Sequence, residues 1–249
     1  MNAGLRVHGL RLHYGSLRTV DGVDLSLEPG ARHALIGPNG AGKSTLIDLL
    51  AGVRRPDAGR IELDGVDITA LPTERRARLG LVRTFQVNTL FHSLSPLRSV
   101  VLAIAEREGL GGVWWRPLAP TGRHRALFDE AHALLAALGL DAQAEVPAAE
   151  LPYGRQRVLE IALALAARPR VLLLDEPAAG VPEDESGELL RAVDALPADV
   201  AVLFIEHDMK LVFRFARRIT VLAAGRVLAE GTPEEIAADT RVREAYLHG

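Results

Sequence analysis

One short stretch of this chain restricts its fold more than any other: a glycine-rich turn between a predicted strand and a predicted helix. The strand is expected at Arg32–Ile36, and the helix is expected to run from Lys43 to about Leu50. A strand that passes through such a turn directly into a helix is typical of a phosphate-binding P-loop. The turn consists of Gly37, Pro38, Asn39, Gly40, Ala41, Gly42, Lys43, Ser44 and Thr45.

The residue types in this turn suit the phosphates of a nucleotide. Glycine lets backbone N–H groups turn inward around an anion, and the start of the helix adds its dipole. Lys43 is expected to reach the β- and γ-phosphates, and Ser44 is expected to bind Mg²⁺. The alternative is a chance match in a glycine-rich turn, which arises in roughly one chain of this length in a hundred.

Two carboxylates follow a second apolar run and indicate where hydrolysis would occur. Val171–Leu174 predicts a buried strand, and Asp175 and Glu176 emerge at its carboxyl end, where open α/β sheets bind ligands. Asp175 could hold Mg²⁺ through water, and Glu176 could polarise the attacking water. The alternative is that both acids only cap the following turn. His207 ends another apolar strand, where it could contact a γ-phosphate or serve only in the structure.

The apolar pattern as a whole predicts an α/β protein. Val171–Leu174 and Val200–Ile205 are unbroken apolar runs, typical of strands covered on both faces of a parallel sheet. Leu5–Tyr14 and Val20–Leu27 alternate apolar and polar residues, which predicts a pair of antiparallel strands. Further strands are expected at Arg60–Leu63 and Leu81–Phe85, and a helix at Gly187–Leu196.

Between these strands the pattern becomes mostly helical, so we expect a helical insertion in an α/β core. The expected division is a single domain over residues 1–249, with a core at 1–86 and 168–249 and a helical subdomain at 87–167.

Composition excludes several other classes of protein. The net charge of −3 gives no general affinity for nucleic acid, and the absence of cysteine excludes disulfides and thiolate metal sites. No apolar run approaches the ~20 residues that span a bilayer, and the first eleven residues lack the pattern of a secretory signal. If the protein works at a membrane, we expect another subunit to hold it there.

Several ATPase families share the glycine-rich turn, the two carboxylates and the histidine, and a further motif distinguishes among these families. Leu151–Arg157 reads Leu-Pro-Tyr-Gly-Arg-Gln-Arg and resembles the ABC signature, whose usual form is Leu-Ser-Gly-Gly-Gln. Gln86 resembles the Q-loop glutamine, Tyr14 resembles the aromatic residue that stacks on adenine, and Pro177–Val181 resembles the D-loop. These motifs occur in the order of the family, so the chain is identified as a member of the ABC ATPases.

The resemblance implies the ABC ATPase fold: a P-loop NTPase core with an antiparallel β subdomain and an inserted α-helical subdomain. It implies ATP and Mg²⁺ as ligands, Gln86 as a catalytic residue and metal ligand that could sense the γ-phosphate, and His207 as a catalytic residue. It also implies a shared site, in which the signature of a second protomer closes over ATP. The signature residues expected to bind nucleotide are Tyr153, Gly154, Arg155 and Gln156. Pro152 stands where the usual signature has serine and offers no hydroxyl or N–H.

Several runs also resemble the ATP-binding subunits of branched-chain amino-acid importers, among them Tyr153–Arg157, Asp175–Gly180 and the tail from Glu230. This resemblance implies two integral membrane permease subunits, a second ATPase subunit (another chain or a second copy) and, indirectly, a secreted solute-binding protein. It implies a peripheral location at the cytoplasmic face of the inner membrane and no nucleic acid partner. Lipopolysaccharide or lipid exporters, urea or amide importers, and soluble non-transport ABC ATPases remain as alternatives.

An arginine run and a tryptophan pair are expected to have no binding role. Arg75, Arg76 and Arg78 predict a solvated helix face rather than a nucleic-acid site. Trp114 and Trp115, in a Gly/Pro-rich loop, are expected to pack locally rather than to dock on a membrane partner.

Overall fold

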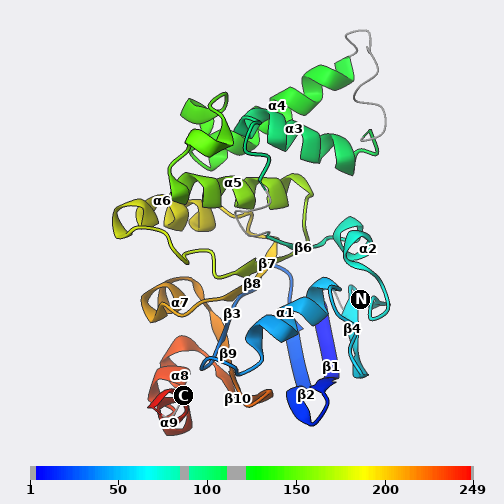
Figure 1. The fold of residues 1–249 in the computed structure, drawn as a ribbon, viewed down its shortest axis with the longest axis vertical. Helices are drawn as coiled ribbons and strands as arrows, with labels where there is room; N and C mark the ends of the chain where they lie inside the picture. Colours follow the sequence, from blue (N-terminus) through cyan, green and yellow to red (C-terminus); the bar gives the residue numbers. More distant parts are fainter. Residues whose placement is uncertain (1–3, 85–89, 111–121, 248–249) are drawn as a thin grey trace. The chain divides into compact units, whose positions relative to one another are not determined.

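The computed structural model describes residues 4–84, 90–110 and 122–247 (Figure 1). Contacts within the chain divide it into two compact units. Unit 1 comprises Met1–Arg83, Arg170–Pro177 and Pro197–Gly249, and unit 2 comprises Thr84–Pro169 and Ala178–Leu196.

A mostly parallel six-stranded sheet forms the centre of unit 1, with the strand order β10-β9-β3-β8-β7-β6. The strands are β3 Arg32–Ile36, β6 Leu81–Arg83, β7 Val171–Asp175, β8 Ala201–Ile205, β9 Arg218–Ala223 and β10 Arg226–Gly231. β8 pairs in parallel with β3 on one side and β7 on the other, and β9 pairs in parallel with β3. Among the described strands of this sheet, only the pairing between β9 and β10 is antiparallel. Every residue of β8 is buried, which confirms the prediction drawn from its unbroken apolar run.

The second sheet of unit 1 is antiparallel, as predicted, and shares a core with the first. Its order is β2-β1-β4-β5, with β1 at Leu5–Tyr14, β2 at Leu17–Leu27, β4 at Ala58–Leu63 and β5 at Val66–Asp67. Helix α1, Lys43–Ala51, contributes Leu46 and Leu50 to an apolar cluster that includes strands of both sheets (Figure 1). The helix that follows the glycine-rich turn is therefore fixed by apolar packing on both sides.

Short helices complete unit 1. They are α2 Thr73–Arg78, α7 Met209–Phe215, α8 Pro233–Ala238 and α9 Thr240–Leu247. Helix α8 begins with a capping box, in which the Thr232 side chain accepts from the Glu235 N–H and the Glu235 carboxylate accepts from the Thr232 N–H. This reciprocal pairing satisfies two of the N–H groups that a helix start leaves without partners.

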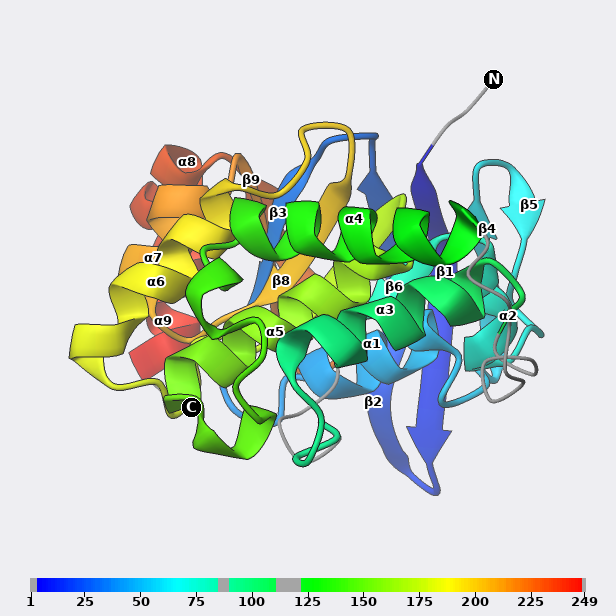
Figure 2. The ribbon, with the colours of Figure 1, turned by 90° about the horizontal axis from the view of Figure 1, so that it is seen from above.

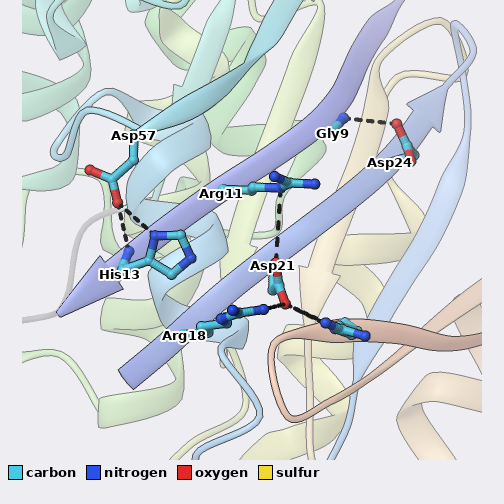
Figure 3. Close-up of polar contacts among 8 residues, drawn as sticks. Gly9, Arg11, His13, Arg18, Asp21, Asp24 and Asp57 are labelled. Atoms are coloured by element: carbon cyan, nitrogen blue, oxygen red, sulfur yellow. Dashed lines mark hydrogen bonds and ion pairs between the residues drawn. The ribbon is translucent and has the colours of Figure 1, made fainter. Parts of the chain in front are cut away.

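Polar contacts join the antiparallel sheet to the glycine-rich turn through Asp21, whose ion pairs Figure 3 shows. The Asp21 carboxylate accepts from Arg18 at 3.3 Å and from Arg226 at 2.6 Å, and the Arg226 hydrogen bond holds the pKa of Asp21 below its usual range. The Asp21 backbone N–H donates to the Gly225 carbonyl at 2.8 Å, and the Gly225 N–H donates to the Ala41 carbonyl at 3.0 Å. Strand β2 is thus linked to the turn by consecutive hydrogen bonds through Gly225, the residue that precedes β10.

The prediction for Arg76 was wrong, because this side chain is buried rather than solvated. Only 1% of Arg76 is exposed, and its guanidinium donates to four backbone carbonyls, those of Leu49, Leu50, Thr69 and Leu71, at 2.6–2.9 Å. Burial lowers the pKa of Arg76 to about 10, so the side chain keeps its charge at neutral pH. Leu49 and Leu50 lie in the last turn of α1, where the helix itself leaves carbonyls without partners; the Leu49 carbonyl also accepts from the Gly52 N–H at 3.3 Å. Arg76 therefore stabilises the end of the P-loop helix.

Unit 2 is helical. Its helices are α3 Pro96–Arg107, α4 Gly122–Ala137, α5 Tyr153–Ala166 and α6 Glu183–Asp194, with single 3₁₀ turns at Asp141–Gln143 and Ala148–Glu150. Figure 2 shows α3, α4 and α5 side by side, and these three helices contact one another. Helix α6 packs on α5, so Ala178–Leu196 groups with the helices and not with the core to which the sequence assigned it.

Buried His33 on β3 is expected to make folding sensitive to acid. Its Nε2 lies 2.7 Å from the Thr220 hydroxyl, and burial lowers the pKa of His33 to about 4. As pH falls from about 6.5 towards 4, the unfolded chain gains a proton that the folded chain does not bind, so the free energy of unfolding falls. Between pH 7 and pH 5 this loss should be about 2 kcal/mol for His33.

Urea unfolding of the native chain and His33→Gln at pH 7 and pH 5 measures this difference. The variant should lose about 2 kcal/mol less than the native chain over that interval. His8→Gln serves as the control because His8 is exposed, and it should behave as the native chain does. An equal loss in all three proteins would assign the acid sensitivity to other groups.

Candidate functional site

The glycine-rich turn connects β3 to α1 and adopts backbone conformations that favour glycine. Gly42 precedes the first residue of α1 with φ +102, and a Cβ at this position would lie 2.3 Å from the Thr19 carbonyl oxygen. Gly40 has φ +76 and faces open space, with no atom within 4 Å of the position of a Cβ. The turn is therefore packed against the protein on one side and open on the other.

Lys43 places its ammonium inside the turn. The Nζ atom donates to the Gly37 carbonyl at 2.7 Å and to the Pro38 carbonyl at 3.0 Å, and only 6% of the residue is exposed. Burial lowers the pKa of Lys43, and the charge of Glu176 opposes that shift. A cation is thus held beside the turn and within the electrostatic influence of Glu176.

Parallel strands bring the predicted acids and the histidine to one edge of the six-stranded sheet. Asp175 is the last residue of β7 and pairs in register with Ile205, the last residue of β8. Two residues after Ile205, the His207 Nε2 lies 2.8 Å from the Glu176 Oε1. Both side chains of this pair are more than one-third exposed, so they stand at a surface that solvent and substrate can reach.

The backbone of Glu176 is unusual for a residue with a side chain. Its φ is +48, in the left-handed region, and its N–H donates to the Ile205 carbonyl at 3.1 Å. This conformation costs on the order of 1 kcal/mol for a residue that is not glycine. The chain turns sharply here, directly after β7.

Sequence patterns gave no indication of Arg83, which the structure places beside Asp175. Arg83 ends β6, next to β7, and its guanidinium contacts Asp175 at 2.5 Å and Asp48 of α1 at 2.7 Å. A single arginine at the end of a three-residue strand forms no motif. Its position after a buried strand is the only signal that could have identified it.

Tyr14 ends β1 and is 45% exposed, with the Arg54 guanidinium 5.4 Å from the centre of its ring. An exposed ring is free to stack on a base, whereas a buried ring would not be. Tyr14 belongs to the same unit as the glycine-rich turn.

We predict that Tyr14→Ala weakens ATP binding and leaves inorganic triphosphate binding unchanged. Stacking of a base on an aromatic ring contributes roughly 1–3 kcal/mol, which corresponds to about 5- to 150-fold in affinity. Calorimetry with both ligands measures the effect, and Tyr14→Phe, which keeps the ring, is the matched control. Equal losses for the two ligands would leave Tyr14 with a structural role only.

The predicted signature residues lie in unit 2, at the start of α5. Pro152 precedes the helix without a side-chain cap, and the Gly154 N–H donates to the Glu185 carboxylate of α6 at 2.6 Å. Arg155 pairs with Glu188 at 2.8 Å, and the Gln156 amide donates to the Leu151 carbonyl at 2.9 Å. The Tyr153 hydroxyl donates to the Ala179 carbonyl at 3.5 Å. Each predicted residue thus has a partner in its own unit, and Glu185 and Glu188 are contacts that the motif did not predict.

Gln86, Trp114 and Trp115 lie outside the described residues. Within the described ranges, no group of three or more His, Cys, Asp or Glu side chains is arranged to hold a metal ion. The exposed Ser44 hydroxyl and the Asp175 carboxylate are oxygen donors of the kind that Mg²⁺ prefers, and phosphate and water oxygens would complete its six ligands. These donors fit a magnesium ion that arrives with a nucleotide.

Comparison with known proteins identifies two matching families. The family described as ABC transporter matches residues 20–179, and the family described as branched-chain amino acid ATP-binding cassette transporter matches residues 226–247. Two curated relatives are 40% identical over 248 residues, covering 98% of this chain and 97% of their own. They are the high-affinity branched-chain amino acid transport ATP-binding proteins BraF of Pseudomonas aeruginosa and LivG of Escherichia coli K12.

Solved structures agree with this similarity. A nucleotide-free ATP-binding cassette from an ABC transporter matches with a TM-score of 0.84 at 29% identity, covering 98% of each chain. A cassette in its ADP conformation matches with the same TM-score at 28% identity, covering 99% of each chain. Among the described residues, no helix has the length and apolar character needed to cross a membrane.

Proposed function

The chain belongs to the ABC transporter family as an ATP-binding and ATP-hydrolysing subunit, and we propose that it energises the import of branched-chain or other hydrophobic amino acids. The main support for this class of transported substrate is the match of residues 226–247 to the branched-chain family. That segment begins with β10 and ends with α9, outside the residues matched by the general ABC family. Identity of 40% to two importer subunits over nearly the whole chain supports the same assignment.

In this proposal the turn Gly37–Thr45 binds the phosphates of ATP. Its backbone N–H groups and the start of α1 face the anion, and Lys43 exchanges its two carbonyl partners for phosphate oxygens. Ser44 and Asp175 hold Mg²⁺, which neutralises charge on the β- and γ-phosphates when bound. The ring of Tyr14 stacks on adenine.

Glu176 and His207 act on the attacking water and the γ-phosphate. The Glu176 carboxylate accepts a proton from the water as the water attacks phosphorus, which is the role of a general base. His207 bonds to Glu176 at Oε1 and thereby orients the carboxylate. Gln86 takes the role of the Q-loop glutamine, as a metal ligand that senses the γ-phosphate.

A second ATPase subunit completes the site, either a different chain or another copy of this one. If it is another copy, its signature residues Tyr153, Gly154, Arg155 and Gln156 close over the ATP bound by Lys43. If it is a different chain, the signature of that chain closes over this ATP, and these four residues close over the ATP of the other subunit. Closure drives two integral membrane permease subunits, and a secreted solute-binding protein delivers the cargo to them. The chain lies peripherally at the cytoplasmic face of the inner membrane.

Uptake measurements test the cargo. Cells that lack this chain should lose high-affinity uptake of radiolabelled leucine, isoleucine and valine, and a plasmid copy should restore it. Uptake of urea and the amount of surface lipopolysaccharide, measured in the same cells, should not change. Normal amino-acid uptake combined with a defect in urea uptake or surface lipopolysaccharide would replace the proposed cargo by that alternative.

A further inference from the structure

Arg83 joins two acidic residues from different elements at the edge of the predicted magnesium site. One guanidinium nitrogen donates to Asp48 of α1 at 2.7 Å, and the other donates to Oδ2 of Asp175 at 2.5 Å. All three side chains are largely buried, with exposures of 22%, 23% and 16% for Arg83, Asp48 and Asp175. Asp48 lies one turn after Ser44 on α1, so Arg83 bonds to the two elements that carry the magnesium donors.

The charge at Arg83 is permanent. Burial acts to lower the pKa of Arg83, but the hydrogen bonds that it donates to Asp48 and Asp175 outweigh this effect and raise the pKa. One cation therefore faces two carboxylates that are removed from most of the solvent, where charges interact more strongly than they do in bulk water. Without Arg83, both carboxylates would lie near the nucleotide-binding turn with no cation between them.

We propose that Arg83 is a resident cation that positions Asp175 and sets how strongly nucleotide binding depends on magnesium. It bonds to Oδ2 of Asp175, so Oδ1 is the oxygen that this contact leaves for a metal. It also neutralises part of the acidic charge that would otherwise repel ATP before Mg²⁺ has bound. Arg83 thus performs, from within the protein, part of the charge compensation that the metal supplies. This inference rests on the proposed role of Asp175 toward Mg²⁺.

The dependence on magnesium provides the test. The affinity for ATP is measured at low ionic strength with EDTA and again with saturating Mg²⁺, for the native chain and for Arg83→Met. The variant should lose about tenfold or more in EDTA and only a few-fold in Mg²⁺, because the metal replaces the missing cation. Equal losses in both buffers would overturn the inference and leave Arg83 with a structural role.

Two further variants distinguish an effect of charge on ATP affinity from an effect of the substitution on folding. Arg170→Met removes an arginine that also bonds to an aspartate, Asp64, in the same unit but is 67% exposed, and it should bind ATP as the native chain does in both buffers. Asp48→Asn keeps the contact between Arg83 and Asp175 and removes one negative charge, so its affinity in EDTA should rise. A fall in that affinity, with an unchanged melting temperature, would contradict the proposal even if Arg83→Met did not fold.

The two proposals fail in different ways. If neither the native chain nor Arg83→Met changed its affinity for ATP between EDTA and Mg²⁺, the magnesium role of Asp175 would be wrong, and the role of Arg83 with it. If the native chain responds to Mg²⁺ and Arg83→Met shows the same ratio of affinities, only the role of Arg83 is wrong.

Discussion

Replacement of Glu176 by glutamine is expected to leave ATP binding intact and to slow hydrolysis by about 10²–10⁴-fold. Glutamine keeps the size of the side chain and can still pair with His207, which lies 2.8 Å from Glu176, but it cannot accept a proton from water. With hydrolysis blocked, ATP stays between two protomers. A transient, ATP-dependent pairing should then become stable.

Phosphate release measures the rate, and size-exclusion chromatography with ATP and with ADP measures the pairing, with and without the second ATPase subunit. Glu234→Gln, an exposed change on α8, should behave as the native chain does in both assays. Hydrolysis at the native rate would remove Glu176 as the general base. Blocked hydrolysis without an ATP-dependent pair in either mixture would contradict the shared site.

Arg76→Met is expected to produce the largest loss of stability of the changes considered for this chain, roughly 3–5 kcal/mol. Methionine fills much of the space but leaves four carbonyls, two of them buried and two part-buried, without the donors that Arg76 provides. Two of those carbonyls, of Leu49 and Leu50, belong to the last turn of the P-loop helix. The end of that helix should therefore be the first part to open.

Urea unfolding measures this loss, and Arg75→Met is the matched control. Arg75 is the preceding residue on the same helix and is exposed, so its replacement should change the free energy of unfolding by less than about 0.5 kcal/mol. A similar small change for Arg76→Met would mean that water satisfies the four carbonyls when the arginine is absent.

The same residue shows where sequence-based prediction reached its limit. Strands β3, β7 and β8 were predicted because their apolar runs are local, and α1 was predicted because glycine, lysine and serine mark its start. The burial of Arg76 depends on carbonyls that lie up to 27 residues away in the chain, so its own neighbours in sequence suggest an exposed basic helix.

The residues of the candidate site also fall into two groups: those that local sequence predicts and those that depend on contacts between distant segments. Lys43, Asp175, Glu176 and His207 are recognisable because each stands next to a glycine-rich turn or a buried strand. Arg83 meets Asp175 only because β6 pairs with β7, which lies nearly ninety residues later in the chain. The partnership of Gly154 with Glu185 likewise requires α6 to pack on α5, and the pattern predicted that α6 begins at Gly187 rather than at Glu183.

At position 176, the residue that suits catalysis differs from the residue that suits the left-handed backbone. Glycine adopts a φ of +48 without steric cost and would relieve a strain of on the order of 1 kcal/mol, but glycine has no carboxylate. The folded chain therefore carries a permanent penalty at the position where it needs a base. Selection for a more stable protein and selection for a faster one favour different residues at position 176.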